Sequence, residues 1–196
     1  MKFQQVYFVV DDSFRLLWIG GEWDESALAN GGSDARSNEV LSTSLLSHIT
    51  DEPTRRATQA MAEAVQDTQT ALRIDYRCDS PTLKRRYLMT IQPMKDNRVL
   101  FVHDLRDAQT FPVTFSQWRH QPGADALKCS FCCSVSLPDT DWTPPEVLAG
   151  PHPDVVDFTL CPDCEARITE AVSALRDGRK PGVSTTSGYG PEGTAS

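Results

Sequence analysis

The sequence has no long apolar run, and its best stretch, VYFVV at Val6–Val10, has only five residues. A membrane-spanning helix needs about 20 consecutive apolar residues, so we expect no membrane segment. Asp11 and Asp12 follow the stretch too early for it to act as a secretion signal. Hydrophobic residues still make up 39% of the chain, which is enough for a packed core. We therefore expect a folded, cytoplasmic protein.

A surplus of basic residues is also missing. The net charge is -8, and residues 107–196 carry 12 acidic but only 6 basic side chains. Nucleic-acid binding usually requires lysine and arginine side chains against the phosphates. The one basic run, Lys84-Arg85-Arg86, is expected to be the solvated face of a strand. The charge distribution therefore argues against nucleic acid as a partner.

Signatures of catalysis are absent as well. The sequence contains no GxSxG, P-loop or HExxH motif and no kinase or cyclase signature. Asp79 and Ser80 lie in a predicted turn, but the sequence places no histidine beside them. We therefore predict that the protein is not an enzyme.

Cysteine is nearly missing from the first two-thirds of the chain, where Cys78 stands alone. The last third contains CSFC at Cys129–Cys132, followed at once by Cys133, and CPDC at Cys161–Cys164. Two residues between cysteines allow a tight turn that points both sulfurs at one site, and two such turns form the tetrahedral thiolate cage that Zn²⁺ accepts. In a reducing cytoplasm, such pairs bind metal more often than they form disulfides. The predicted ligands of a structural zinc ion are Cys129, Cys132, Cys161 and Cys164.

Two alternatives to this ligand set stay open. Cys133 could take the place of Cys132, although the first pair would then be CxxxC. His152, in GPHPD, could enter the coordination sphere if one cysteine were displaced. Four sulfurs leave no position for water, which is why a structural role is expected rather than a catalytic one.

The residues after CPDC have helical periodicity, and Gly178 is expected to end the helix. Pro162 suits its first turn. Cys161 and Cys164 would then lie at the N-terminus of the helix, where the helix dipole favours thiolate. The sequence thus predicts a turn at the first CxxC pair, an intervening strand and a second cysteine pair on a helix. This order is typical of a treble-clef or zinc-ribbon module.

Patterns in the first hundred residues predict strands, then helices, then further strands. A hairpin is expected from Val6–Val10 and Phe14–Gly20, and a long helix is expected to begin near Thr50, which would cap it. Period-two alternation over Leu72–Cys78 predicts a half-buried strand that ends in a buried thiol. Two more strands follow, joined across KDN at Lys95–Asn97. This order, in which strands and helices occupy separate stretches of the sequence, predicts an α+β domain with an antiparallel sheet and helices on one face.

Four segments follow from these patterns. Residues 1–107 form the α+β domain, 108–126 a linker, and 127–177 the four-cysteine module. The low-complexity residues 178–196 are predicted to be a disordered tail.

The stretches WDESALANGG, VLSTSLLSHITDEPTR, YRCDSPTLKRRYLMTIQP and CSFC…W…CPDC together resemble a group of bacterial PAS-like proteins. These proteins join a PAS-type sensory domain to a C-terminal cysteine module, and the resemblance spans roughly residues 5–175. It implies a five-stranded antiparallel sheet with helices on one face, enclosing a pocket. It also implies a sensory or signalling adaptor whose partner is a signalling protein or a second copy of the chain, and whose pocket could take a small molecule.

The candidates for holding a cofactor in such a pocket are His103, Cys78 and His48. His103 shares a strand face with Val99 and Phe101, so it is expected to be a core residue hydrogen-bonded to a neighbour. His48 is expected at the surface or at a helix cap. We expect no organic cofactor. The alternatives are a haem-binding PAS sensor that uses His103, and a redox- or metal-responsive zinc switch with Cys133 as a resolving thiol.

Overall fold

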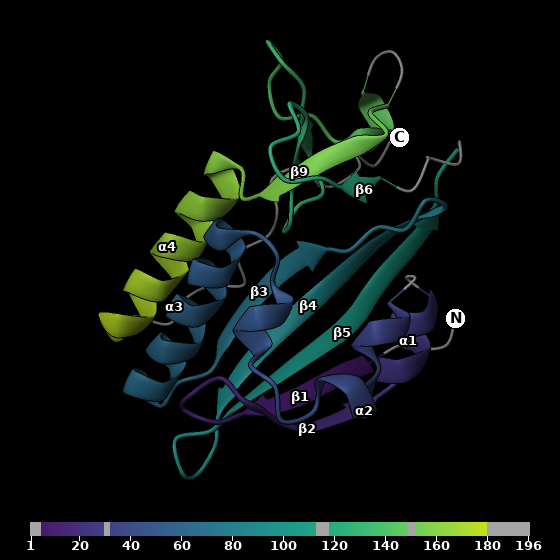
Figure 1. The fold of residues 1–196 in the computed structure, drawn as a ribbon. Coiled ribbons are helices and arrows are strands. Elements are labelled where there is room, and N and C mark those ends of the chain that lie inside the picture. Colours follow the sequence, from purple (N-terminus) through teal and green to yellow (C-terminus); the bar gives the residue numbers. More distant parts are fainter. Residues whose placement is uncertain (1–4, 30–31, 113–117, 149–151, 180–196) are drawn as a thin grey trace, which may run out of the picture.

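A computed structural model of the chain describes residues 5–29, 32–112, 118–148 and 152–179. Its largest element is a five-stranded antiparallel sheet with the strand order β2-β1-β5-β4-β3 (Figure 1). The strands are β1 (Gln5–Val10), β2 (Leu16–Gly21), β3 (Leu72–Arg77), β4 (Leu83–Pro93) and β5 (Val99–Thr110). The predicted α+β class with an antiparallel sheet is confirmed.

Two of the three hairpin turns in this sheet show clear local causes. Between β1 and β2, the amides of Ser13 and Arg15 both donate to Oδ1 of Asp11, at 2.9 Å each. Between β4 and β5, Asp96 and Asn97 take left-handed φ values of 59° and 55°, as tight hairpin turns require. Both predicted hairpins are therefore confirmed.

Helical segments connect β2 to β3 and lie over one face of the sheet (Figure 1). They are α1 (Trp23–Ala29), η1 (Ser33–Ala35), α2 (Ser37–Val40), η2 (Leu45–His48) and α3 (Glu52–Thr68). The predicted long helix is present, but Thr50 does not cap it. Asp51 is the N-cap, because its backbone is extended and its Oδ1 accepts a 2.8 Å hydrogen bond from the amide of Thr54. No helix among the described residues is long and apolar enough to cross a membrane.

The cysteine-rich part, described over residues 118–148 and 152–179, forms a second, smaller sheet with the order β6-β9-β7-β8. Its elements are β6 (Arg119–His120), β7 (Leu127–Cys129), β8 (Val135–Ser136), η3 (Pro145–Val147), β9 (Val155–Thr159) and α4 (Pro162–Arg176). The predicted helix after CPDC is α4, which lies beside α3 (Figure 1). Gly178, just beyond its end, has a φ of 71°, the left-handed conformation that closes many helices.

One hydrophobic core extends through both parts of the chain. It joins Ile74 of β3 and Val65 of α3 to Cys129 of β7 and Ile168 of α4. The predicted boundaries of the domain, linker and module stay a prediction. Residues 180–196 of the predicted tail lie outside the described residues.

The predicted solvation of the basic run is wrong. Arg85 is only 7% exposed, and its Nε donates to the backbone oxygen of Cys78 at 2.7 Å. Nζ of Lys84 lies 2.6 Å from Oε1 of Glu146 in η3. Two of the three cations therefore make internal contacts, Lys84 with the cysteine-rich part and Arg85 with the chain just after β3.

Candidate metal centre and adjoining cavity

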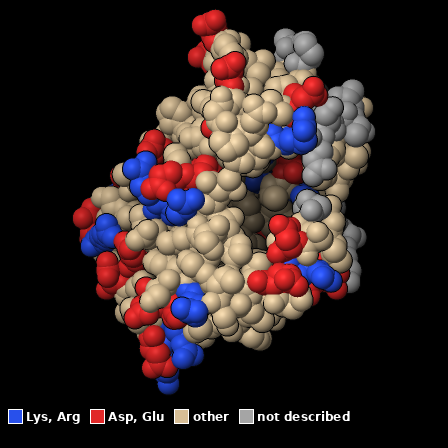
Figure 2. Space-filling model, viewed as in Figure 1, with Lys and Arg blue, Asp and Glu red and all other residues tan. Residues whose placement is uncertain are grey.

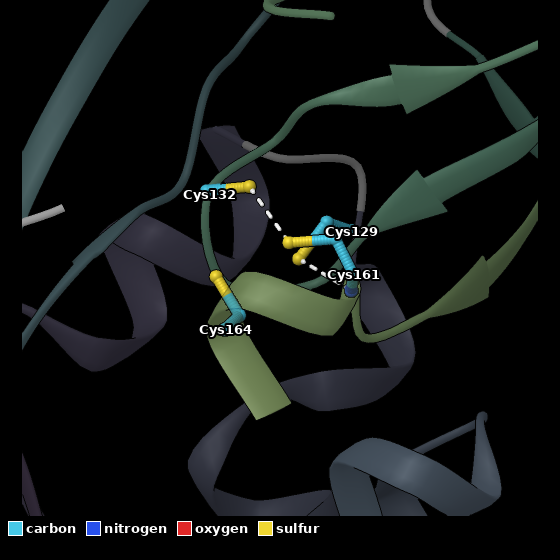
Figure 3. Close-up of side chains that lie close together, drawn as sticks. All are labelled: Cys129, Cys132, Cys161 and Cys164. Carbon is cyan, nitrogen blue, oxygen red and sulfur yellow. Dashed lines mark hydrogen bonds between the residues drawn. The ribbon is translucent and has the colours of Figure 1, made fainter. Parts of the chain in front are cut away.

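The side chains of Cys129, Cys132, Cys161 and Cys164 meet at one point between β7 and α4, and their ligand atoms all lie within 4.8 Å of one another. Cys132 is partly exposed and the other three are buried. Figure 3 shows the four thiols pointing toward one another, with Cys164 on the first turn of α4. The cluster could hold a metal ion, as the two CxxC motifs predict.

A tight turn after β7 presents the first pair. The amide of Cys129 donates to the oxygen of Ser134 at 2.8 Å, and the amide of Cys133 donates to the oxygen of Cys129 at 3.1 Å. Cys133 closes the turn with a φ of 63°. The amides of Phe131 and Cys161 both donate to Sγ of Cys129 at 3.4 Å. Backbone donors directed at sulfur favour the thiolate form that a metal requires.

The second pair is presented by the start of α4. Cys161 is the N-cap of the helix and Pro162 occupies its first turn. The partial positive charge at a helix N-terminus stabilises an anionic sulfur. A guanidinium nitrogen of Arg167, one turn further on, lies 3.8 Å from Sγ of Cys164. The local sequence therefore supplies positive potential on the side of the cluster formed by α4.

The four clustered thiols shift one another's pKa values. Hydrogen bonding to Cys129 lowers the pKa of Cys132, whereas hydrogen bonding to Cys132 raises the pKa of Cys129. The pKa of Cys164 is also raised, chiefly by its hydrogen bond with Cys129. Four thiolates at this spacing, three of them buried, would repel one another. A divalent cation removes that repulsion, and thiolates are ligands that Zn²⁺ accepts.

The two alternative ligands lie elsewhere. Sγ of Cys133 points to the backbone oxygen of Arg77, 3.5 Å away, and is 3.7 Å from Nζ of Lys128. Burial raises the pKa of this thiol to about 12. His152 stacks on Trp118 with 5.8 Å between ring centroids. Within the described part of the chain, neither residue belongs to the four-sulfur group.

Contacts from the cysteine loop (Cys129–Cys133) and from η3 join the cysteine-rich part to the large sheet and α3. Oγ of Ser130 donates to Oδ2 of Asp51 at 2.9 Å, and the amide of Arg77 donates to the oxygen of Phe131 at 2.7 Å. The Arg77 guanidinium binds the carboxylates of Asp79 and Glu146, with the Glu146 contact at 3.1 Å. The sequence pattern placed Arg77 on the polar face of its strand and gave no signal for Glu146. Only the fold brings these residues together.

An apolar cavity of about 350 Å³ lies next to the metal centre, between the large sheet and its helices. Figure 2 shows a hollow on this face, between the cysteine-rich part and the α1 region. The lining residues come from the sheet, from α1, η2 and α3 and from the cysteine loop; they include Phe8, Trp23, Thr54, Tyr76, Phe101, His103 and Phe131. The cavity is therefore closed on one side by Ser130 and Phe131, which stand between two of the four clustered cysteines.

His103 lies on the cavity wall, with its Nδ1 2.9 Å from the hydroxyl oxygen of Tyr76. Its ring also stacks on Phe8, 5.6 Å away. Burial lowers the pKa of His103 to about 4, so the imidazole is neutral at neutral pH. The expected hydrogen bond between His103 and a neighbour is confirmed.

The two other candidates for holding a cofactor are Cys78 and His48. Cys78 is exposed, so the prediction of a buried thiol is wrong. It stands just past the end of β3, where the chain leaves the sheet, and contributes to the cavity at its edge. His48 is exposed at the end of η2, with Nε2 2.6 Å from the hydroxyl of Thr43, as expected of a surface residue.

Comparison of the chain with protein-family models, with curated proteins and with solved structures gives no match. The four-cysteine cluster and the cavity beside it are therefore the features of the chain that point to a function.

Proposed function

We propose that this protein is a non-enzymatic sensory or signalling adaptor. A PAS-like domain takes up a small molecule or a partner, and a structural zinc module of the treble-clef or zinc-ribbon kind presents a surface for protein interaction. The observation that carries the proposal is the 350 Å³ cavity, which is bounded by the sheet, its helices and the cysteine loop.

The assignment of zinc is supported by the donor set. Four thiolates in a tetrahedral arrangement complete the coordination of Zn²⁺ and leave no place for a reactive water. The cysteine-rich part has short strands of two to five residues. A structural zinc ion contributes on the order of 10–16 kcal/mol in comparable small modules, so it would hold these strands and the start of α4 in place.

The role in protein interaction is supported by apolar side chains on the surface. Val147 of η3 is 65% exposed and Trp18 of β2 is 56% exposed. Apolar side chains mark contact sites when they form a contiguous patch, so these two are the positions at which we test for a partner surface. A signalling protein or a second copy of the chain is the proposed partner. Nucleic acid is disfavoured by the charge of -8.

The proposal is tested by screening the purified, zinc-loaded chain against small metabolites for a shift in thermal midpoint. In parallel, the chain is used to capture partners, with Val147→Asp and Trp18→Asp as matched variants. The proposal predicts either a ligand that raises the midpoint or a regulator that the wild type retains and one variant loses. A protein that binds neither ligand nor partner would not be a sensory adaptor.

A redox-responsive zinc switch is the second candidate, and one observation favours it. A cleft of about 140 Å³ opens onto Cys132, Cys161 and Cys164, so a small oxidant could reach three of the four sulfurs. Peroxide would then be reduced to water while two thiolates lose two electrons and join as a disulfide, which releases the zinc ion. Zinc release at about one equivalent of peroxide supports this candidate, whereas release only on general unfolding rejects it.

A further inference from the structure

We infer that the cavity binds a small, neutral, ring-bearing molecule, and that the loop between Cys129 and Cys132 makes this binding depend on the metal centre. The inference rests on the proposed function, for which it names the class of ligand and the means of its control.

The chemistry of the cavity wall defines the ligand class. Aromatic rings surround the space on several sides, among them Phe8, Trp23, Tyr76 and Phe131. Such rings favour offset or edge-on contact with another ring. No aspartate, glutamate, lysine or arginine belongs to the lining that the structure describes. A charged ligand would lose its hydration without gaining a counter-charge, so a neutral one is favoured.

One polar group on the wall has no partner. Oγ1 of Thr54 is buried and makes no hydrogen bond within the described part of the chain. A buried hydroxyl without a partner is energetically unfavourable, and each such group in a folded protein calls for an explanation. Thr54 lines the cavity but its hydroxyl is not exposed to it, so a turn of the side chain about χ1 would bring the hydroxyl to a polar substituent on the ligand. The ligand is therefore a ring compound that carries at least one hydrogen-bonding group.

The cysteine loop forms one wall of the same cavity. Ser130 and Phe131 both line the space, and they are the two residues between the first pair of metal ligands. The Phe131 ring meets Tyr76 edge-on, 6.2 Å away. A metal ion that binds Cys129 and Cys132 would therefore also fix the position of this wall of the cavity.

A second path connects the loop to Thr54. Ser130 donates to Oδ2 of Asp51, and Oδ1 of Asp51 accepts the amide of Thr54. One carboxylate therefore links the cysteine loop to the first turn of α3. Because Phe131 belongs to the loop and the Thr54 amide is linked to it through Asp51, ligand and metal should stabilise each other. Such coupling is reciprocal, so the bound ligand must also tighten the binding of the metal.

The ligand class is tested with two probes, 2-naphthol and naphthalene, titrated into the zinc-loaded full chain by calorimetry. Both should bind, 2-naphthol more tightly. Thr54→Val keeps the shape but removes the hydroxyl, and it should weaken 2-naphthol binding about fivefold while naphthalene binding is unchanged. Absence of binding by either probe up to its solubility limit overturns the ligand class. Equal weakening of both probes overturns the role of Thr54.

The coupling is tested by the rate at which the folded chain gives up zinc to a coloured chelator. Saturating 2-naphthol should slow this transfer about fivefold. Thr58→Trp places an indole in the cavity from α3, so the rate in this variant should not respond to 2-naphthol; Thr58→Phe serves if the first variant misfolds. A rate that is the same with and without bound 2-naphthol overturns the coupling. Failure to find a signalling partner would remove the protein-interaction part of the proposed function and leave both binding results standing.

Discussion

Oγ of Ser130 donates a 2.9 Å hydrogen bond to Oδ2 of Asp51, across 79 positions of sequence. Ser130 stands between two proposed metal ligands, and Asp51 is the N-cap of α3. This contact joins the metal centre to the helix that bounds the cavity. The metal centre and the cavity are thus adjacent parts of one structure and share a hydrophobic core.

Ser130→Ala should lower the free energy of unfolding by about 1.5 kcal/mol, because a hydrogen bond to a charged acceptor is lost and Asp51 is only 9% exposed. Denaturant titration measures the change. Ser173→Ala, at an exposed position of α4, is the matched control. A double-mutant cycle with Asp51→Ala should show strong coupling between the two residues, and simple additivity would mean that the contact carries no energy.

Arg77→Met should destabilise the chain by about 3 kcal/mol, because it leaves two carboxylates without their buried cation. The side chains of Arg77 and Asp79 are 7% and 8% exposed. Burial opposes ionisation of Glu146, but hydrogen bonds from Arg77 and Lys84 outweigh it and lower its pKa. Thermal or denaturant unfolding measures the loss. Arg56→Met, on an exposed side chain, should change stability little, and equal effects of the two variants would contradict the account.

Lowering the pH should reduce the free energy of unfolding, because the imidazole of His103 resists protonation in the folded chain. Its pKa of about 4 in the folded chain lies below the ordinary 6.5, so the unfolded chain takes up a proton first as the pH falls. Stability is therefore lost between those two values, by about 2 kcal/mol from pH 7 to pH 5. The facing groups change this little, because Tyr76 stays protonated and Asp104 only partly offsets the effect of burial.

His103→Gln removes this proton uptake and keeps a group that can bind the Tyr76 hydroxyl. The difference in unfolding free energy between the wild type and His103→Gln should therefore shrink by about 2 kcal/mol over the same pH range. Comparing the two proteins cancels the acid sensitivity of the thiolates, which they share. A difference that does not vary with pH would show that His103 titrates normally.

Removal of the metal by a chelator should affect the two sheets differently. Hydrogen exchange in β9 and α4 should accelerate strongly, because the cysteines hold the end of one element and the start of the other. The pairing of β4 with β5 spans eleven residues of β4 and does not include the cluster, so its amides should keep most of their protection. Uniform acceleration across the chain would mean that the large sheet also depends on the metal.

Local patterns were sufficient to predict the elements that carry their own signals. The hairpins, the α+β class and the helix after CPDC follow from alternation, turn residues and the spacing of cysteines. The spacing of the cysteines also made the four-sulfur cluster of Cys129, Cys132, Cys161 and Cys164 predictable. Two residues between cysteines allow a tight turn that directs both sulfurs to one site.

Contacts between distant segments could not be predicted in this way. Lys84 and Arg85 lie next to each other on β4 and so point to opposite faces of the sheet. Lys84 pairs with Glu146 of η3, and Arg85 donates to the backbone oxygen of Cys78, so both use partners distant in the sequence or beyond the end of a strand. Cys78 fits the alternation of its strand but falls beyond the last paired residue, Arg77, so it is exposed. The cap of α3 was misplaced by one residue because Thr50 and Asp51 both have suitable side chains. Only the position of the Asp51 carboxylate decides between them.

The metal content of the purified chain tests the central claim most directly. Elemental analysis should find one zinc ion per chain in the wild type and none in a Cys129→Ser, Cys161→Ser double variant, which loses one thiolate from each pair. Wild-type protein that contains no metal, yet is fully ordered from residue 129 to 177, would contradict the account.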